Sequence, residues 1–141
     1  LRGDAVADAA SRVAAIPAVR AELLELQRDF AAHPPGGASG AILDGRDIGS
    51  VICPQADVKL FVTASPEIRA QRRFTELARA GQAASFEEVL ADIHARDRRD
   101  SARATAPLRQ LPDAHLVDTS NLSVDEAIAT ALAIVDAARR P

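Results

Sequence analysis

The stretch "VKLFVTASPEIRAQRR", residues 58–73, joins a predicted strand directly to a predicted helix. Residues 58–64 form a short apolar run rich in branched side chains, which favours a strand. Ser65 and Pro66 are suited to begin a helix, because serine is a good N-cap and proline fits the first helical position. Gly81 is suited to end that helix near residue 80. A strand that passes straight into a helix indicates a parallel α/β sheet with crossover connections.

The rest of the chain extends this pattern. "AILD" (41–44) and "AHLVDT" (114–119) are further apolar runs that fit strands. Helices are predicted for 4–15 and 17–32, and two more begin at capping boxes, Ser85 with Glu88 and Ser123 with Glu126. The apolar positions that recur at helical spacing are Val19, Leu23, Leu26 and Phe30 in one helix and Phe86, Val89, Leu90 and Ile93 in another. Three strands make a thin sheet, so we expect a segment on the N-terminal side to complete it.

Composition narrows the class of protein. The chain has 141 residues, of which 48% are hydrophobic, which suffices for the core of one domain. Its formal net charge of −3 argues against broad nucleic-acid binding. Cys53 is the only cysteine and the three histidines lack metal-ligand spacing, so we expect no disulfide and no metal site. The lone cysteine fits a reducing compartment, so we expect a cytoplasmic location, and since no long apolar run or signal peptide is present, we expect no membrane contact. The first residue is Leu1 and methionine is absent, so we interpret the chain as part of a longer product.

The stretch "RDRRDSAR", residues 96–103, concentrates arginines in an acidic chain. On a helix, one face would carry Arg96, Arg99, Asp100 and Arg103. An exposed, salt-bridged helix is one interpretation. The other is a lid that closes over phosphate, in which the arginines stabilise a transferring phosphoryl group and Asp97 and Asp100 reduce their mutual repulsion.

A second polar cluster follows the predicted strand at 41–44. Arg46 and Asp47 lie in the segment "LDGRDIGS", and ligands of open α/β sheets bind at the carboxyl ends of the strands. A surface ion pair is the simpler alternative. The segment "PPGGASG" is no phosphate-binding P-loop, because it lacks lysine and precedes a strand candidate instead of a helix. No Walker A motif occurs anywhere in the 141 residues.

Three segments in this order closely resemble the bacterial cytidylate kinases, a nucleoside monophosphate kinase family of the P-loop fold. They are "DGRDIGSVICPQADVKLFVTASPEIRAQRR" (44–73), "SFEEVLADIHARDRRDSARATAPL" (85–108) and "DTSNLSVDEAI" (118–128). The resemblance begins at "AASRVAAIPAVR" (9–20) and runs over essentially the whole chain. The chain departs from the family in a longer loop at 33–40 and in lacking the N-terminal glycine-rich phosphate loop and first strand.

The resemblance implies a three-layer α/β/α parallel sheet of the P-loop kinase type, without its N-terminal strand and P-loop. It implies a single domain over 1–141, in which 1–40 belong to the region that binds the nucleoside monophosphate and about 82–112 form a lid. The implied reaction transfers the ATP γ-phosphoryl group to CMP or dCMP, with Mg²⁺. The partners would be these nucleotides, and the protein would be a monomer. Because the P-loop is missing, we expect the 141 residues alone to be inactive.

The resemblance also implies roles for individual residues. Ser11, Arg20 and Asp47 would face the cytosine edge, and Arg46 and Arg103 would contact the monophosphate or the base. Arg96 and Asp100 would contact the ribose and the acceptor phosphate, and Arg72, with Arg69 or Arg73 nearby, would reach the ATP phosphates. The catalytic arginines would then be Arg72, Arg96 and Arg103. A carboxylate accepts a hydrogen bond from cytosine N4, so we predict a preference for CMP over UMP.

Two other functions remain open from the sequence. One is a P-loop kinase with a different small acceptor. The other is a non-catalytic module whose arginine-rich helix docks RNA or an acidic partner, for which we expect steep salt dependence and no base preference.

Overall fold

A computed structural model of the chain describes residues 9, 13, 16–101 and 108–139. The chain divides into two compact units, residues 1–54 and residues 55–141. None of the helices in the described ranges is long and apolar enough to cross a membrane.

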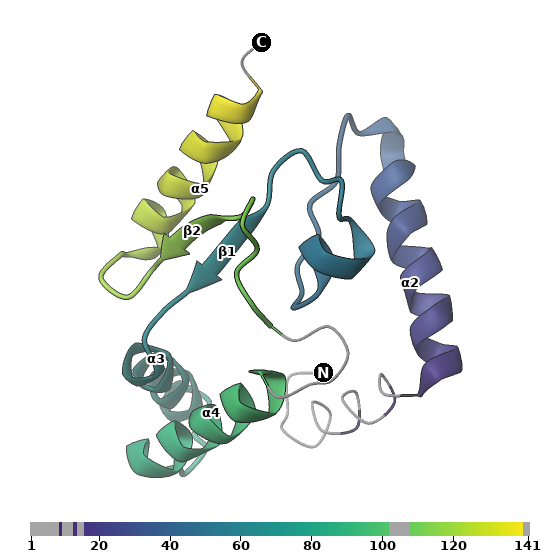
Figure 1. The fold of residues 1–141 in the computed structure, drawn as a ribbon. Coiled ribbons are helices and arrows are strands. Elements are labelled where there is room, and N and C mark those ends of the chain that lie inside the picture. The colour runs from purple at the N-terminus through teal and green to yellow at the C-terminus, as the bar shows by residue number, and fades with distance from the viewer. Residues whose placement is uncertain (1–8, 10–12, 14–15, 102–107, 140–141) are drawn as a thin grey trace. The chain divides into compact units, whose positions relative to one another are not determined.

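The second unit contains a parallel sheet. Strand β1 (Leu60–Thr63) pairs with strand β2 (His115–Asp118) in parallel, and the register sets Leu60 opposite His115. Val117 of β2 is only 2% exposed. The two strands lie side by side, with α3 (Pro66–Arg79) following β1 and α5 (Val124–Ala138) following β2 (Figure 1). The predictions of strands near 58–64 and 114–119, of their parallel pairing and of the α/β class are confirmed.

Helices α3 (Pro66–Arg79) and α4 (Phe86–Ser101) pack against each other in the same unit. Their shared core is made of Ala70, Leu77 and Val89, with partly buried apolar residues around it: Ala84, Phe86, Leu90 and Ile93. The rings of Phe74 and Phe86 meet edge to face at 6.5 Å. The prediction that one apolar face of residues 86–93 points inward is therefore confirmed.

The helix ends form as the sequence predicts. Ser65 Oγ accepts a hydrogen bond from the Ile68 amide at 3.3 Å, and this begins α3. Gly81 adopts a φ of 69°, and the Gln82 amide donates to the Leu77 carbonyl at 3.0 Å, which closes the last turn of α3. Both predicted capping boxes are present, at the starts of α4 and α5. Local side-chain chemistry thus fixes where the helices of this unit begin and end.

The first unit contains helix α2 (Pro17–Ala32), a 3₁₀ turn (η1, Pro35–Gly37) and a single π-helical turn (η2, Ile48–Ile52). The bounds of α2 match the prediction. Its apolar stripe is exposed, however, with Leu23, Leu26 and Phe30 at 42%, 64% and 43%. No residue of α2 is buried. Apolar packing therefore contributes little to holding α2 within the described part of this unit.

The prediction of a strand at 41–44 is wrong. These residues have no strand partner, and Ile42 is 97% exposed. A strand forms only where a neighbour completes its backbone hydrogen bonds, and the described residues of this unit provide no such neighbour. Among the residues that the structure describes, the sheet has two strands instead of the three predicted. The helix predicted at 4–15 lies almost entirely outside the described residues.

Candidate functional site

An arginine–carboxylate pair lies in the first unit. Arg20 of α2 donates a hydrogen bond from Nη2 to Asp47 Oδ2 at 3.0 Å, across 27 positions of sequence. The Arg20 side chain is 41% exposed and that of Asp47 is 23% exposed. This is a single contact, and within the described residues it leaves Asp47 Oδ1 and several N–H groups of Arg20 available to a ligand. The structure thus brings together two of the residues predicted to face the base.

The turn after Asp47 holds that residue in place. The Asp47 carbonyl accepts hydrogen bonds from the Val51 and Ile52 amides at 2.9 and 3.2 Å, and Ile52 is buried. Arg28 lies eight positions after Arg20, slightly more than two turns along α2. Its side chain donates to the carbonyls of the same two residues, Val51 at 2.8 Å and Ile52 at 3.1 Å. The η2 turn is therefore bound both to Asp47 and to α2.

The two remaining residues predicted in this unit are Arg46 and Ser11. Arg46 immediately precedes Asp47 and is partly buried. Ser11 lies outside the described residues, so its predicted contact with the base stays a prediction.

In the second unit, polar groups gather at the carboxyl ends of β1 and β2. The Thr119 amide and hydroxyl both donate to the Thr63 carbonyl, at 2.8 and 2.9 Å. The Ser65 amide donates to Ser120 Oγ at 2.8 Å. Ser120 Oγ in turn donates to Asp118 Oδ1 at 2.6 Å, and this bond is the largest cause that lowers the pKa of Asp118. These bonds order the edge of the sheet where α/β proteins bind ligands.

Arg72 of α3 binds this edge. Its Nη1 donates to Thr119 Oγ1 at 3.0 Å, and its Nη2 donates to the Thr119 carbonyl at 2.6 Å. Thr119 is 8% exposed. The predicted catalytic arginine thus lies at the carboxyl edge of the sheet, with both terminal nitrogens bound to the end of β2.

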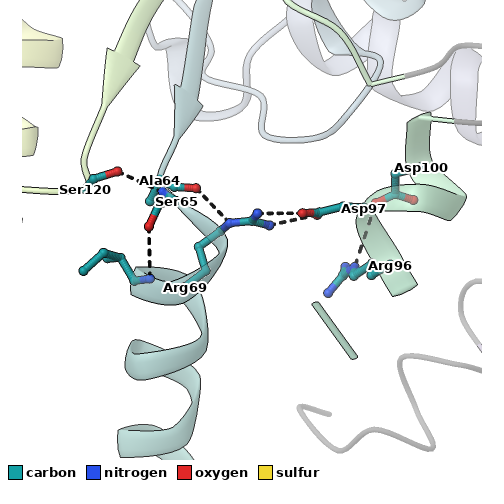
Figure 2. A network of polar contacts seen from close by, with 8 residues as sticks. Ala64, Ser65, Arg69, Arg96, Asp97, Asp100 and Ser120 are labelled. Atoms are coloured by element: carbon teal, nitrogen blue, oxygen red, sulfur yellow. Dashed lines mark hydrogen bonds and ion pairs between the residues drawn. The ribbon is translucent and has the colours of Figure 1, made fainter. Parts of the chain in front are cut away.

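Arg69 of α3 binds Asp97, which belongs to the arginine-rich segment 96–103. Its two terminal nitrogens donate to the two carboxylate oxygens of Asp97 at 2.8 and 2.6 Å, and its Nε donates to the Ala64 carbonyl at 3.0 Å. Figure 2 shows the guanidinium between the end of β1 and helix α4. The hydrogen bonds from Arg69 hold the pKa of Asp97 below its usual value. Among the described residues, Asp97 therefore hydrogen-bonds to Arg69 of α3 and not to an arginine of the segment 96–103.

Arg96 and Asp100 lie one turn apart on α4. Arg96 Nε is 4.0 Å from Asp100 Oδ2, with side chains 61% and 6% exposed, and Figure 2 shows this contact as separate from the bonds between Arg69 and Asp97. The Asp100 carbonyl accepts from the Leu108 amide at 3.3 Å. Arg103 and the side chain of Arg99 lie outside the described part, so their predicted place on the same face stays a prediction.

The sequence reasoning missed three partners: Asp97 for Arg69, Thr119 for Arg72, and the η2 carbonyls for Arg28. Each pair is separated by more than 20 positions, and no local motif signals such a contact. As for metals, residues 9, 13, 16–101 and 108–139 contain no group of three or more His, Cys, Asp or Glu side chains that could hold an ion.

Comparison with known proteins matches this arrangement of motifs. The family model described as cytidylate kinase matches residues 1–137. The cytidylate kinase of Azorhizobium caulinodans is 64% identical over 139 residues, which is 99% of this chain and 66% of that protein. Those of Paramagnetospirillum magneticum and Rhodospirillum rubrum are 58% and 55% identical, over 99% and 96% of this chain and 65% and 63% of their own lengths. The chain thus spans just under two thirds of the length of these relatives, and it belongs to the cytidylate kinase family.

Proposed function

We propose that the whole protein transfers the γ-phosphoryl group of ATP to CMP or dCMP, and that this chain supplies the base-recognition pair and several of the phosphate-binding arginines. The observation that carries the proposal is the Arg20–Asp47 contact, because it joins a donor and an acceptor at 3.0 Å with hydrogen-bonding capacity to spare. The relatives named cytidylate kinase support the same reaction.

The chemistry of the pair suits cytosine. Its N4 amino group donates to a carboxylate, and its N3 and O2 atoms accept from a guanidinium, so Asp47 and Arg20 complement the edge of the base. Uracil carries O4 in place of N4, which sets an acceptor against the carboxylate of Asp47. An unpaired buried polar group costs about 1–3 kcal/mol, so this mismatch alone gives roughly 5- to 150-fold discrimination.

The arginines of the second unit suit phosphoryl transfer. In this reaction a phosphate oxygen of CMP forms a bond to the γ-phosphorus of ATP as the bond to the ADP oxygen breaks, and positive side chains stabilise the spreading negative charge. Arg72 at the carboxyl edge of the sheet and Arg96 on α4 are our candidates among the described residues, with Arg103 as the third. Arg46 is our candidate for the acceptor phosphate, and Asp100 for the ribose.

Magnesium enters this proposal with its nucleotide. Mg²⁺ commonly binds through phosphate oxygens and waters with few protein carboxylates, so MgATP is written here as the substrate. We assign no magnesium ligand among the described residues, since they form no suitable cluster. The segment around 82–112 is proposed as the lid that excludes water during transfer.

The test is a comparison of acceptors with the whole protein. CMP, dCMP, UMP, AMP and dTMP are offered at equal concentration with MgATP, and the rate of ADP formation is measured. We expect CMP and dCMP to be phosphorylated at least tenfold faster than UMP. Preference for another acceptor would overturn the assignment of cytosine while retaining a kinase.

An RNA titration separates the remaining alternative. If the arginines dock RNA, binding weakens steeply with salt and shows no base preference. The proposed function instead predicts that each chain binds one CMP. It also predicts that RNA does not bind at physiological salt and does not compete with CMP. RNA binding without CMP binding would replace the proposal.

A further inference from the structure

Within the first unit, the base-recognition pair depends on the position of the loop that carries Asp47. Asp47 is on the loop that leads into η2, while Arg20 is on α2, so the distance between them depends on how that loop is fixed to the helix. Ile52 in η2 is buried, whereas no residue of α2 is. Within the described residues, apolar packing on α2 is therefore limited, and polar contacts contribute to fixing the loop to the helix.

Arg28 supplies the second of these contacts. Its Nη2 donates to the Val51 carbonyl at 2.8 Å, and its Nε donates to the Ile52 carbonyl at 3.1 Å. Carbonyls at the end of a short helical turn lack a partner within that turn, so a guanidinium that spans two of them satisfies both. The same two residues donate their amides to the Asp47 carbonyl. A single peptide turn thus connects the Arg28 side chain to the backbone of Asp47.

The geometry of α2 makes this contact effective. Arg20 and Arg28 are eight positions apart, which corresponds to about 12 Å along a helix and an offset of about 80° around it. Arg20 contacts the start of the loop at Asp47, and Arg28 contacts its end at Val51 and Ile52. A loop held to a helix at two separated points cannot turn about either one, whereas a loop held at Asp47 alone could.

We infer that Arg28 is a positioning residue for base selection: by binding the Val51 and Ile52 carbonyls, it holds the Asp47 carboxylate where it can accept from cytosine N4. The inference rests on the proposed function, because it assigns Arg28 a part in the same recognition of CMP. Arg28 itself touches neither the base nor the phosphates in this account. Its effect reaches substrate only through Asp47.

The first experiment compares Arg28→Met with wild type in the whole protein. Methionine keeps much of the length of the side chain and removes every donor. We expect KM for CMP to rise about tenfold and the CMP-to-UMP ratio of kcat/KM to fall about five- to tenfold, as for the loss of two charge-assisted hydrogen bonds in a partly exposed position. KM for ATP and kcat at saturating CMP stay within about twofold. Arg79→Met, at an exposed arginine of α3, is the matched control and keeps the wild-type values.

A double-mutant cycle distinguishes positioning from a general loss of structure. If Arg28 acts through Asp47, adding Arg28→Met to Asp47→Ala leaves the already reduced CMP-to-UMP ratio unchanged. A purely structural residue would lower activity additively with every acceptor. Arg28→Lys keeps the charge and one donor position, so we expect an intermediate ratio, and it serves as the test variant if Arg28→Met fails to fold.

The possible outcomes distinguish a failure of the role of Arg28 from a failure of the proposed function. Wild-type protein that shows no preference for CMP overturns the proposed function. Wild-type preference for CMP, lost in Asp47→Ala but kept in Arg28→Met or Arg28→Lys, overturns the role of Arg28 alone. Additive losses in the cycle overturn it as well.

Discussion

Two arginine–aspartate pairs, one in each unit, differ in how completely they use their hydrogen bonds. Arg20 and Asp47 make one contact at 3.0 Å. Arg69 and Asp97 make two, at 2.8 and 2.6 Å, and Arg69 also donates to the Ala64 carbonyl. The exposed fractions of the side chains overlap, at 41% and 23% for the first pair and 37% and 36% for the second, so exposure does not separate them.

The difference in bonding assigns the pairs to different tasks. A bidentate pair with a third bond to a strand carbonyl has used the in-plane donors that fit a carboxylate, so it joins α3 to α4 and to β1. A pair with one bond keeps an open carboxylate oxygen and open donors for a ligand. The same two residue types therefore serve structure in one unit and, in our proposal, recognition in the other.

The largest expected effect comes from removing one aspartate from each pair. In the whole protein, Asp47→Ala is expected to lower kcat/KM for CMP about 10- to 100-fold, because the acceptor for N4 is lost, and to change kcat/KM for UMP much less. Steady-state kinetics with both acceptors measures this. Asp97→Ala is the matched variant and should leave the CMP-to-UMP ratio within about twofold of wild type. Equal CMP-to-UMP ratios in Asp47→Ala and wild type would contradict the division of tasks.

The next effect concerns the free energy of unfolding, and we expect it to be larger for the Arg69–Asp97 pair than for Arg20–Asp47. A double-mutant cycle with Arg69→Met and Asp97→Ala is expected to give a coupling free energy of about 1 kcal/mol, which is the upper range for partly exposed ion pairs. For Arg20→Met and Asp47→Ala we expect about half of that or less, since only one hydrogen bond joins them. Urea unfolding of the four variants of each cycle provides the values. A larger coupling for Arg20 and Asp47 would reverse our interpretation.

This contrast could be predicted only in part from the sequence. The starts of α3, α4 and α5, the end of α3 at Gly81 and the strands near 60 and 115 follow from local chemistry, and all were predicted. The wrong prediction of a strand at 41–44 has a different cause. A strand forms only where a neighbouring strand completes its backbone hydrogen bonds, and the local sequence does not show whether such a neighbour is present.

The partners within the site show the same limit. Arg46 and Asp47 were singled out because they follow the strand predicted at 41–44, which does not form, and because their segment resembles the family; the resemblance is the part of that reasoning that stands. The contacts of Asp97 with Arg69 and of Arg28 with the η2 turn join residues more than 20 positions apart, so they depend on the packing of helices and loops. From the sequence, Asp97 was assigned to the arginines of its own segment, and helical spacing could not name the partner on α3.

A smaller effect is expected from pH. Hydrogen bonds from Arg69 lower the pKa of Asp97 below its ordinary value of 3.8 in the folded protein. The stability that this pair contributes is therefore fully present above that value, and it is lost as the pH falls through the lower folded pKa. We expect the difference in unfolding free energy between wild type and Asp97→Asn to be constant from about pH 7 to pH 5 and to shrink below about pH 4. A difference that shrinks near pH 6 would point to another group.

The smallest effect concerns the far end of the helix that carries Asp97. Ser85 and Glu88 form the capping box of α4. Ser85→Ala should lower the free energy of unfolding by about 0.5–1 kcal/mol without changing the coupling between Arg69 and Asp97, because the cap and the ion pair lie about three turns apart. Urea unfolding of Ser85→Ala, alone and with Asp97→Ala, measures both. Strong non-additivity would mean that the ion pair depends on the cap.

The most direct test of the central claim is a crystal structure of the whole protein with bound CMP. We expect cytosine N4 within about 3 Å of the Asp47 carboxylate and the Arg20 guanidinium at hydrogen-bond distance from N3 or O2, while Arg69 still binds both oxygens of Asp97. Cytosine bound elsewhere, or CMP that draws Asp97 away from Arg69 and leaves Asp47 untouched, would contradict the account.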